Sequence, residues 1–270
     1  MTTTALQHKF ATLSHGRTRY YEAGTGAPTL LIHGAGYFSG ADNWLGNIGH
    51  FADGGLHVYA VDCLNWGLGD PFDREFSFAY LVDFIREFQD VMGIEKSHLV
   101  GHSMGGWLGA LFAYESPERL EKLVIVAGGG MATRTLQSMV EFKPPAEEVI
   151  RKTARDRAEQ YGLDADQLEK DYMGGLGRAE TAEGFGKVMR HMTDPMTRSR
   201  YHLGRRLPHI TAPTLIVWGD NDQTNDVSMG KEEHELIKDS RLIIYENCGH
   251  GVPTERRDDF NRDVLAFLKS

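Results

Sequence analysis

Residues 98–114 read HLVGHSMGGWLGALFAY: an apolar run, then a glycine-rich turn, then a helical stretch. The turn matches the pattern G-x-S-x-G from Gly101 to Gly105, with Ser103 at its centre. Between a strand and a helix, such glycines permit a sharp turn that exposes the serine hydroxyl at the start of the helix. The stretch therefore predicts a strand–turn–helix unit that carries a serine nucleophile. The alternative is a plain strand–helix connection in which the serine only caps the helix.

A nucleophilic serine needs a base, and the base needs an acid that orients it. In units of this kind the acid follows the serine in the chain and the histidine comes last. Asp222 follows one apolar run and His250 follows the next, so both should lie at the carboxyl edge of a parallel sheet. We therefore predict a triad of Ser103, Asp222 and His250. Asp220 and Asp226 are the competing acids, and Asp220 has the position of a turn residue.

An oxyanion formed by attack of the serine needs preorganised N–H donors. We expect one donor from the backbone of Met104, the residue after the nucleophile. The other should come from the loop of His33, Gly34, Ala35 and Gly36, with Ala35 as the donor and the two glycines beside the substrate. His33 is expected to hold the geometry of this loop. The loop lacks the G-K-[ST] ending of a phosphate-binding loop.

Eight segments have the composition of strands, and most are separated by helical segments, which predicts an α/β fold with a mostly parallel sheet. These segments are 9–13, 17–22, 29–32, 57–61, 98–100, 123–126, 214–218 and 241–245. The first two read as an antiparallel pair. Residues 131–210 have helical rather than strand character, and an insertion of this length is usually functional. We therefore expect a core of residues 1–130 and 211–270 with a helical lid of residues 131–210.

Composition excludes several classes of protein. The chain of 270 residues has 29 Lys and Arg against 38 Asp and Glu, a formal net charge of −9, which argues against nucleic-acid binding. No apolar run approaches the ~20 residues of a membrane helix, and no signal peptide is evident at the N-terminus. Cys63 and Cys248 have no metal-ligand or redox spacing, so we expect buried thiols in the cytoplasm. A serine triad of this kind needs no metal or organic cofactor.

The whole chain resembles the α/β-hydrolase superfamily. Within it, the chain is similar to the meta-cleavage product hydrolases, which split carbon–carbon bonds in ring-opened aromatic dienoates. The matching stretches are HGAG (33–36) with Asn43, SMGG (103–106), PERLEKL (117–123), GGG (128–130), the acid of WGDND (218–222) and CGH (248–250). The resemblance implies an eight-stranded α/β-hydrolase fold with a helical lid.

The resemblance also implies a small substrate that is anionic and partly apolar. Asn43 would help to hold the dienoate, and a lid arginine would bind its carboxylate; Arg178 is the first candidate and Arg190 the second. A planar guanidinium suits a carboxylate because it donates two parallel hydrogen bonds.

The chain departs from the family pattern at three places. Gly251 stands where an aromatic residue often follows the catalytic histidine, and His102 stands where an asparagine often precedes the serine. Asn65 and Trp66 replace the usual Pro-Gly turn, and Trp66 is expected to line the pocket or to pack nearby. A carboxylesterase or lactonase with the same triad is therefore the alternative function, and a non-catalytic ligand receptor is a remote one. The closing helix and an exposed sheet edge would allow a homodimer.

Overall fold

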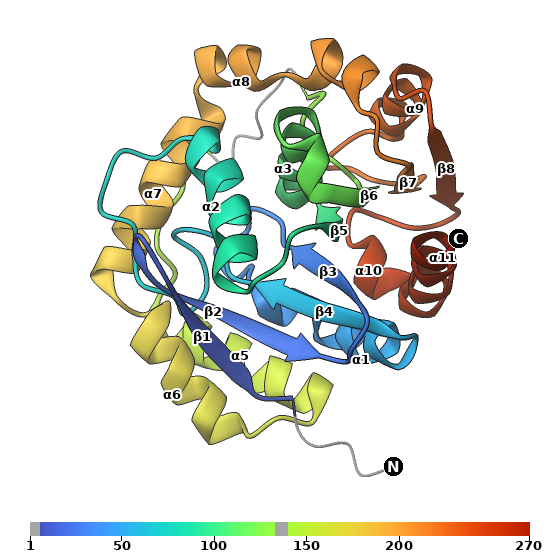
Figure 1. Cartoon of the computed structure of the whole chain (residues 1–270). Coiled ribbons are helices and arrows are strands. Elements are labelled where there is room, and N and C mark those ends of the chain that lie inside the picture. Colours follow the sequence, from blue (N-terminus) through green and yellow to red (C-terminus); the bar gives the residue numbers. More distant parts are fainter. Residues whose placement is uncertain (1–5, 133–139) are drawn as a thin grey trace.

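The computed structural model describes residues 6–132 and 140–270 (Figure 1). Within this part, eight strands form one sheet in the order β1-β2-β4-β3-β5-β6-β7-β8. Their bounds are β1 His8–Leu13, β2 Gly16–Ala23, β3 Ala27–Ile32, β4 Leu56–Val61, β5 Ser97–His102, β6 Leu120–Val126, β7 Thr214–Gly219 and β8 Ser240–Tyr245. Strand β2 pairs antiparallel with β1 and β4, and all other pairs are parallel. The predicted α/β fold and its mostly parallel sheet are confirmed.

Helices cover both faces of the sheet. They are α1 Leu45–Asp53, α2 Phe78–Val91, α3 Met104–Glu115, α9 Val227–Leu236, α10 Val252–Glu255 and α11 Arg257–Lys269. Short 3-10 turns are η1 Ala41–Trp44, η2 Pro117–Arg119, η3 Leu203–Arg205 and η4 Leu207–His209. Helices α2, α3 and α9 pack on one face, and α1 and α11 pack on the other. The strands between them are buried on both faces, which is why they read as continuous apolar runs.

Strand β6 shows how the two faces are built. Leu123 and Ile125 belong to the core under α2 and α3, whereas Val124 and Val126 belong to the core under α1 and α11. Successive side chains of a strand point to opposite faces, so an unbroken apolar run serves both cores.

Helices α1 and α9 are not indicated by the local sequence. Helix α1 contains Gly46 and Gly49, and α9 contains Gly230. Glycine weakens a helix by about 1 kcal/mol relative to alanine, so local propensity does not indicate these helices. Packing against the sheet stabilises them instead: Ile48 and Phe51 are fully buried.

Between β6 and β7, the described residues form four α-helices: α5 Glu147–Tyr161, α6 Ala165–Gly175, α7 Ala179–Thr193 and α8 Pro195–Tyr201. In Figure 1 they run from the yellow-green α5 at the bottom, up the left side, to the orange α8 at the top. A buried charged cluster joins them to the sheet. Arg19 donates to Asp42 at 2.9 Å and to Asp62 at 2.7 Å, and the hydroxyl of Tyr172 in α6 donates to Asp42 at 2.8 Å.

The charges of this cluster compensate each other. Burial alone would raise the pKa of Asp42, but the guanidinium groups of Arg19 and Arg157 outweigh burial and lower the pKa to about 2. A buried ion is tolerated only when it is paired and hydrogen-bonded, so the cluster fixes α5 and α6 in one position against the loop after β3. That loop also carries Asn43.

Glu233 in α9 is also a buried acid, but unlike Asp42 it has no positively charged partner in the described structure. It is fully buried, and neither carboxyl oxygen has a hydrogen-bond partner among residues 6–132 and 140–270. Burial raises the pKa of Glu233 from 4.5 to about 8. The folded protein therefore keeps a proton that the unfolded chain has lost in this pH range.

We expect this acid to make the protein less stable as pH rises. Between pH 4.5 and about 8 the unfolded state binds fewer protons than the folded state, so the free energy of unfolding falls by up to about 1.4 kcal/mol per pH unit. In the Glu233→Gln variant this fall in the free energy of unfolding should be absent. Urea unfolding of the wild type and the variant from pH 5 to 9 measures the free energy of unfolding, and the variant should become increasingly more stable than the wild type as pH rises. Parallel curves would show that Glu233 is not the cause.

Candidate active site

Ser103 lies in a strained turn between β5 and α3. Its φ is +55° and its ψ −109°, a backbone conformation that is rare for a residue with a side chain. A Cβ on Gly101 would lie 2.1 Å from the carbonyl oxygen of Gly105, and one on Gly105 would lie 2.2 Å from that of Ile32. Only glycine fits at either position. The structure thus has the sharp turn that the G-x-S-x-G pattern predicts.

Asp222 and His250 meet beyond the ends of β7 and β8. Nδ1 of His250 lies 2.8 Å from Oδ2 of Asp222, and the Asp222 side chain is fully buried. The other oxygen of Asp222 accepts hydrogen bonds from the backbone N–H groups of Thr224 at 2.8 Å and Asn225 at 2.9 Å. These bonds hold the carboxylate so that it faces the imidazole.

The two competing acids have other roles. The carboxylate of Asp220 accepts from the backbone N–H of Cys248 at 3.3 Å and so closes the turn before His250. Asp226 accepts from the backbone N–H of Ser228 at 2.9 Å and caps α9. Asp222 is therefore the one of the three that contacts the histidine.

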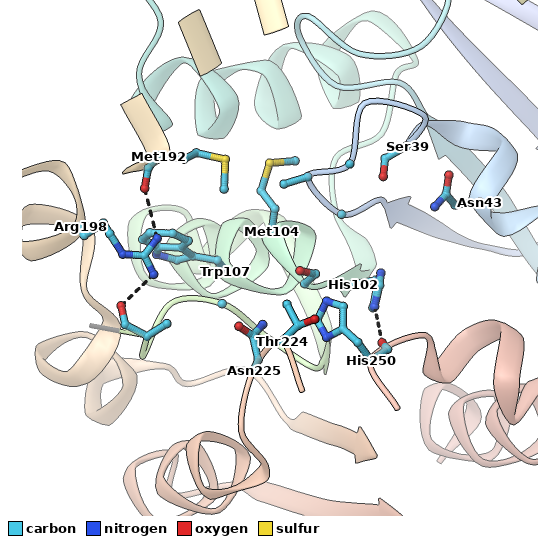
Figure 2. Close-up of a pocket in the computed structure, with 16 residues that line it drawn as sticks. Ser39, Asn43, His102, Met104, Trp107, Met192, Arg198, Thr224, Asn225 and His250 are labelled. Carbon is cyan, nitrogen blue, oxygen red and sulfur yellow. Dashed lines mark hydrogen bonds between the residues drawn. The ribbon is translucent and has the colours of Figure 1, made fainter. Parts of the chain in front are cut away.

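A cavity of about 290 Å³ joins these groups (Figure 2). Its walls come from the loop after β3 with η1, the serine turn with the start of α3, the loops after β6, β7 and β8, the last residues of α7, and α8. The lining residues are Gly34, Ala35, Gly36, Ser39, Asn43, His102, Ser103, Met104, Trp107, Gly129, Ala132, Met192, Arg198, Thr224, Asn225 and His250. Both Ser103 and His250 face this cavity, which we call the catalytic cavity.

The predicted oxyanion donors line the same cavity. Met104 is the first residue of α3, so its backbone N–H has no acceptor within the helix and lies at the positive end of the helix dipole. Ala35 lines the cavity too, between Gly34 and Gly36. Both predicted donor residues therefore border the cavity that Ser103 lines.

His33 holds the oxyanion loop, as predicted. The backbone N–H of Cys63 donates to its Nε2 at 3.0 Å, so Nδ1 carries the proton and donates to the carbonyl of Gly34 at 2.7 Å. Burial lowers the pKa of His33, which keeps the ring neutral.

His102 supports the catalytic histidine through the backbone. Its Nε2 donates to the carbonyl of His250 at 2.8 Å. Burial, together with the nearby His250 ring, lowers the pKa of His102 to about 4, so this ring also stays neutral. His102 thus contributes to the position of the loop that carries His250.

Of the predicted substrate residues Asn43 and Trp66, only Asn43 lines the catalytic cavity. The side-chain oxygen of Asn43 accepts from the backbone N–H of Gly40 at 3.1 Å. Of the two expectations for Trp66, lining the pocket is wrong and packing nearby is confirmed: Trp66 is buried, and its indole N–H donates to the carbonyl of Gly36 at 3.1 Å. It packs behind the oxyanion loop. Asn65 does adopt a positive φ of 68°, which lets the turn form without a glycine.

The expectation that Arg178 or Arg190 lies in the substrate pocket is also wrong. The guanidinium of Arg178 donates to the carbonyls of Gly69 at 2.8 Å and Gly175 at 3.2 Å. Both arginines line a separate cavity among the helices that follow β6. Neither lines the catalytic cavity.

Arg198 in α8 is the arginine that does line the catalytic cavity. Its guanidinium donates to the carbonyls of Met192 at 3.1 Å and Ala132 at 2.9 Å, and lies 5.6 Å from the ring centre of Trp107. Its Nε is buried without a hydrogen-bond partner in the described structure, and burial lowers its pKa. The sequence offered one signal, a group of arginines at 198–206, which does not indicate which of them turns inward.

Two observations concern other kinds of site. Among the described residues, no group of three or more His, Cys, Asp or Glu side chains is arranged to hold a metal ion. None of the helices in residues 6–132 and 140–270 has the length and apolar character that crossing a membrane requires.

This fold and this site define a class of protein. Residues 29–263 match the model of the alpha/beta hydrolase family, and the chain belongs to that family. The predicted superfamily is thereby confirmed.

Individual relatives show which members of this family the chain is similar to. The chain is 32% identical to a 2-hydroxy-6-oxononadienedioate/2-hydroxy-6-oxononatrienedioate hydrolase of Burkholderia vietnamiensis, over 94% of this chain and 91% of the relative. It is 30% identical to a 2-hydroxy-6-oxo-6-phenylhexa-2,4-dienoate hydrolase of Comamonas testosteroni, over 95% and 93%. Among solved structures, the meta-cleavage product hydrolase CumD of Pseudomonas fluorescens IP01 matches with a TM-score of 0.78 and 27% identity, covering 98% of both chains. The resemblance to meta-cleavage product hydrolases is confirmed by these matches.

Proposed function

We propose that this protein is a serine hydrolase that cleaves a carbon–carbon bond in a carboxylated ring-fission dienoate, with Ser103, His250 and Asp222 as its triad. The relatives support the reaction class, since their names describe hydrolases of 2-hydroxy-6-oxo dienoates. Such substrates share a carboxylate at one end of a planar chain and a ketone at its sixth carbon.

One observation supports this substrate most directly. Ser103, His250 and Arg198 line the same catalytic cavity, and Figure 2 shows Arg198 and His250 at opposite ends of the group of lining side chains. Between them lie Met104 and Trp107, which offer an apolar surface, and also the polar residues Thr224 and Asn225. A planar chain fits along this apolar surface, with its carboxylate on Arg198 and its ketone in front of the serine. The guanidinium has five N–H donors and uses two on backbone carbonyls, so donors remain for a carboxylate.

The residues divide the chemistry as follows. Asp222 orients His250 and stabilises its charged form. His250 takes a proton from Ser103 or from a water, and the resulting oxygen nucleophile adds to the ketone. The N–H groups of Met104 and Ala35 stabilise the oxyanion. Before cleavage, the enol proton of the dienoate moves to carbon 5, which gives the keto tautomer with a conjugated ketone beside the bond that breaks. When the carbon–carbon bond breaks, its electron pair passes into this unsaturated ketone, which accepts a proton. The ketone carbon leaves directly as a carboxylic acid if a water was the nucleophile; if Ser103 was the nucleophile, it forms an ester of Ser103 that a water then hydrolyses.

We further propose that residues 131–210 act as a lid on a core of residues 1–130 and 211–270. Met192 and Arg198 belong to this segment and form part of the cavity wall. A cytoplasmic location agrees with Cys63 and Cys248, both free and buried. Strand β8 lies at an edge of the sheet with α11 near it in Figure 1, and this edge would serve a homodimer.

A paired assay tests the proposed reaction. The purified protein is given a ring-fission dienoate, followed by its visible absorbance, and p-nitrophenyl acetate, each with a Ser103→Ala control. We expect fast loss of the dienoate and feeble ester turnover. Strong ester turnover with an unchanged dienoate would instead indicate a carboxylesterase or lactonase with the same triad.

Arg198→Gln is expected to raise KM for the dienoate by about 30- to 150-fold, because a buried charge-assisted pair contributes about 2–3 kcal/mol. KM for p-nitrophenyl acetate, which has no carboxylate, should change less than threefold. Arg178→Gln is the matched control, since its side chain lies outside the catalytic cavity. Equal effects of the two substitutions on the dienoate would contradict the assigned role of Arg198.

A further inference from the structure

A second cavity, of about 740 Å³, adjoins the catalytic cavity on the side of α8. Four arginines line it, Arg198, Arg200, Arg205 and Arg206, together with His202, and its lining contains no Asp or Glu. We call it the arginine cavity. In a chain with a net charge of −9, this is a local concentration of positive charge.

In the part of the chain that the structure describes, the arginines of this cavity have no carboxylate partners. The ion pairs formed within residues 6–132 and 140–270 include none of the four arginines. Arg206 donates to the carbonyl of His202 at 2.9 Å and lies over the ring of Tyr114, and its Nε is buried without a partner in the described structure. Carbonyl and ring contacts orient a guanidinium but leave its charge uncompensated.

The arginine cavity is contiguous with the catalytic cavity. Arg198 and Ala132 line both. The guanidinium of Arg198 spans the carbonyls of Met192 and Ala132, so it lies at the boundary between the two spaces. An anion held by the outer arginines would therefore be next to the residue that receives the substrate carboxylate.

We propose that the arginine cavity is a binding site for small carboxylate anions, and that it captures the anionic substrate before the substrate enters the catalytic cavity. The second half of this inference rests on the proposed function. A protein with net charge −9 repels an anion at long range, and a cavity lined by one sign of charge reverses this locally and raises the rate of encounter. Guanidinium groups also match the geometry of a carboxylate.

Arg200 and Arg205 are the residues to test, because both are exposed and neither lines the catalytic cavity. The test variant is Arg200→Gln/Arg205→Gln. The control is Arg74→Gln/Lys238→Gln, which removes two exposed positive charges outside both cavities. A second variant, Arg200→Lys/Arg205→Lys, restores the charge in the arginine cavity.

The first measurement is titration calorimetry with succinate, which requires no turnover. We expect the glutamine variant to bind succinate at least about tenfold more weakly than the wild type, whereas the control binds as the wild type does and the lysine variant recovers most of the affinity. Unchanged affinity in the glutamine variant would overturn the proposal, since succinate would then bind elsewhere. An equal loss in the control would also overturn it, because net charge alone would explain the effect.

The second measurement is kinetic. For the dienoate, kcat/KM of the glutamine variant should fall by about tenfold with kcat retained, and its dependence on ionic strength should become weaker. For the neutral p-nitrophenyl acetate, kcat/KM should not change. Loss of succinate binding without any change in kcat/KM for the dienoate would overturn the capture role. A wild-type enzyme that ignores the dienoate would refute the proposed function and leave the succinate result as an independent test of the site.

Discussion

Ser103→Ala should reduce turnover of the dienoate by about 10⁴-fold or more, because removing the nucleophile of a triad leaves only binding and oxyanion stabilisation. The fold should be retained, since alanine keeps the Cβ that already exists at φ +55° and adds no strain. Single-turnover absorbance measurements with excess enzyme give the rate. A titration of the variant with the dienoate, followed by the same absorbance, reports whether the variant still binds the substrate.

Ser39→Ala is the matched control, because Ser39 lines the same cavity and lies apart from His250 in Figure 2. The turnover rate of Ser39→Ala should stay within about threefold of the wild-type rate. The substitution changes the polarity of the cavity but removes no group that reacts with the substrate. If Ser103→Ala keeps more than about a tenth of the wild-type activity, Ser103 is not the catalytic serine.

Asp222→Asn should reduce kcat by about 10³- to 10⁴-fold at neutral pH. The carboxylate now accepts the Nδ1 proton of His250 at 2.8 Å, which leaves Nε2 free to accept a proton from the serine. An amide N–H in place of that oxygen favours the tautomer with its proton on Nε2, and this tautomer cannot act as the base. The substitution also removes the negative charge that stabilises the imidazolium form of His250.

Asp226→Asn is the control for this substitution. Asp226 caps α9, and asparagine caps a helix as well as aspartate does, so stability and kcat should both remain near the wild-type values. Steady-state kinetics with circular dichroism of both variants provides the comparison. A larger loss for Asp226→Asn than for Asp222→Asn would assign the acid to the other residue.

Much of the chemistry could be predicted because it depends on local sequence. The turn at Ser103 needs glycine at fixed positions, and the buried strands need apolar runs of four to six residues, so both leave a pattern in neighbouring letters. Asp222 and His250 follow two such runs directly. Parallel strands bring their carboxyl ends to one edge, so the chain order alone predicts that these residues meet.

Other features depend on contacts between segments that are distant in the chain. Helices α1 and α9 contain glycines and form because the sheet provides an apolar surface for them. The place of Trp66 after β4 allows it to line the pocket or to pack nearby, and in the structure its indole N–H donates to the carbonyl of Gly36 behind the oxyanion loop. An aromatic side chain packs equally well on either side of such a loop, and the local sequence does not indicate which side it occupies.

The sequence by itself determined an α/β fold with a mostly parallel sheet and the serine turn, since each follows from spacing along one or two neighbouring elements. It also predicted the order of the proposed triad residues, and the family resemblance implied the α/β-hydrolase topology. The tertiary structure alone decided which of the arginines lines the catalytic cavity. Arg178, Arg190 and Arg198 all lie in the helical segment between β6 and β7, and all have the same side chain. Their directions follow from how α7 and α8 pack over the sheet, and Arg198 alone reaches carbonyls on the rim of the catalytic cavity. That packing is a property of the assembled protein, because it depends on residues far apart in the chain.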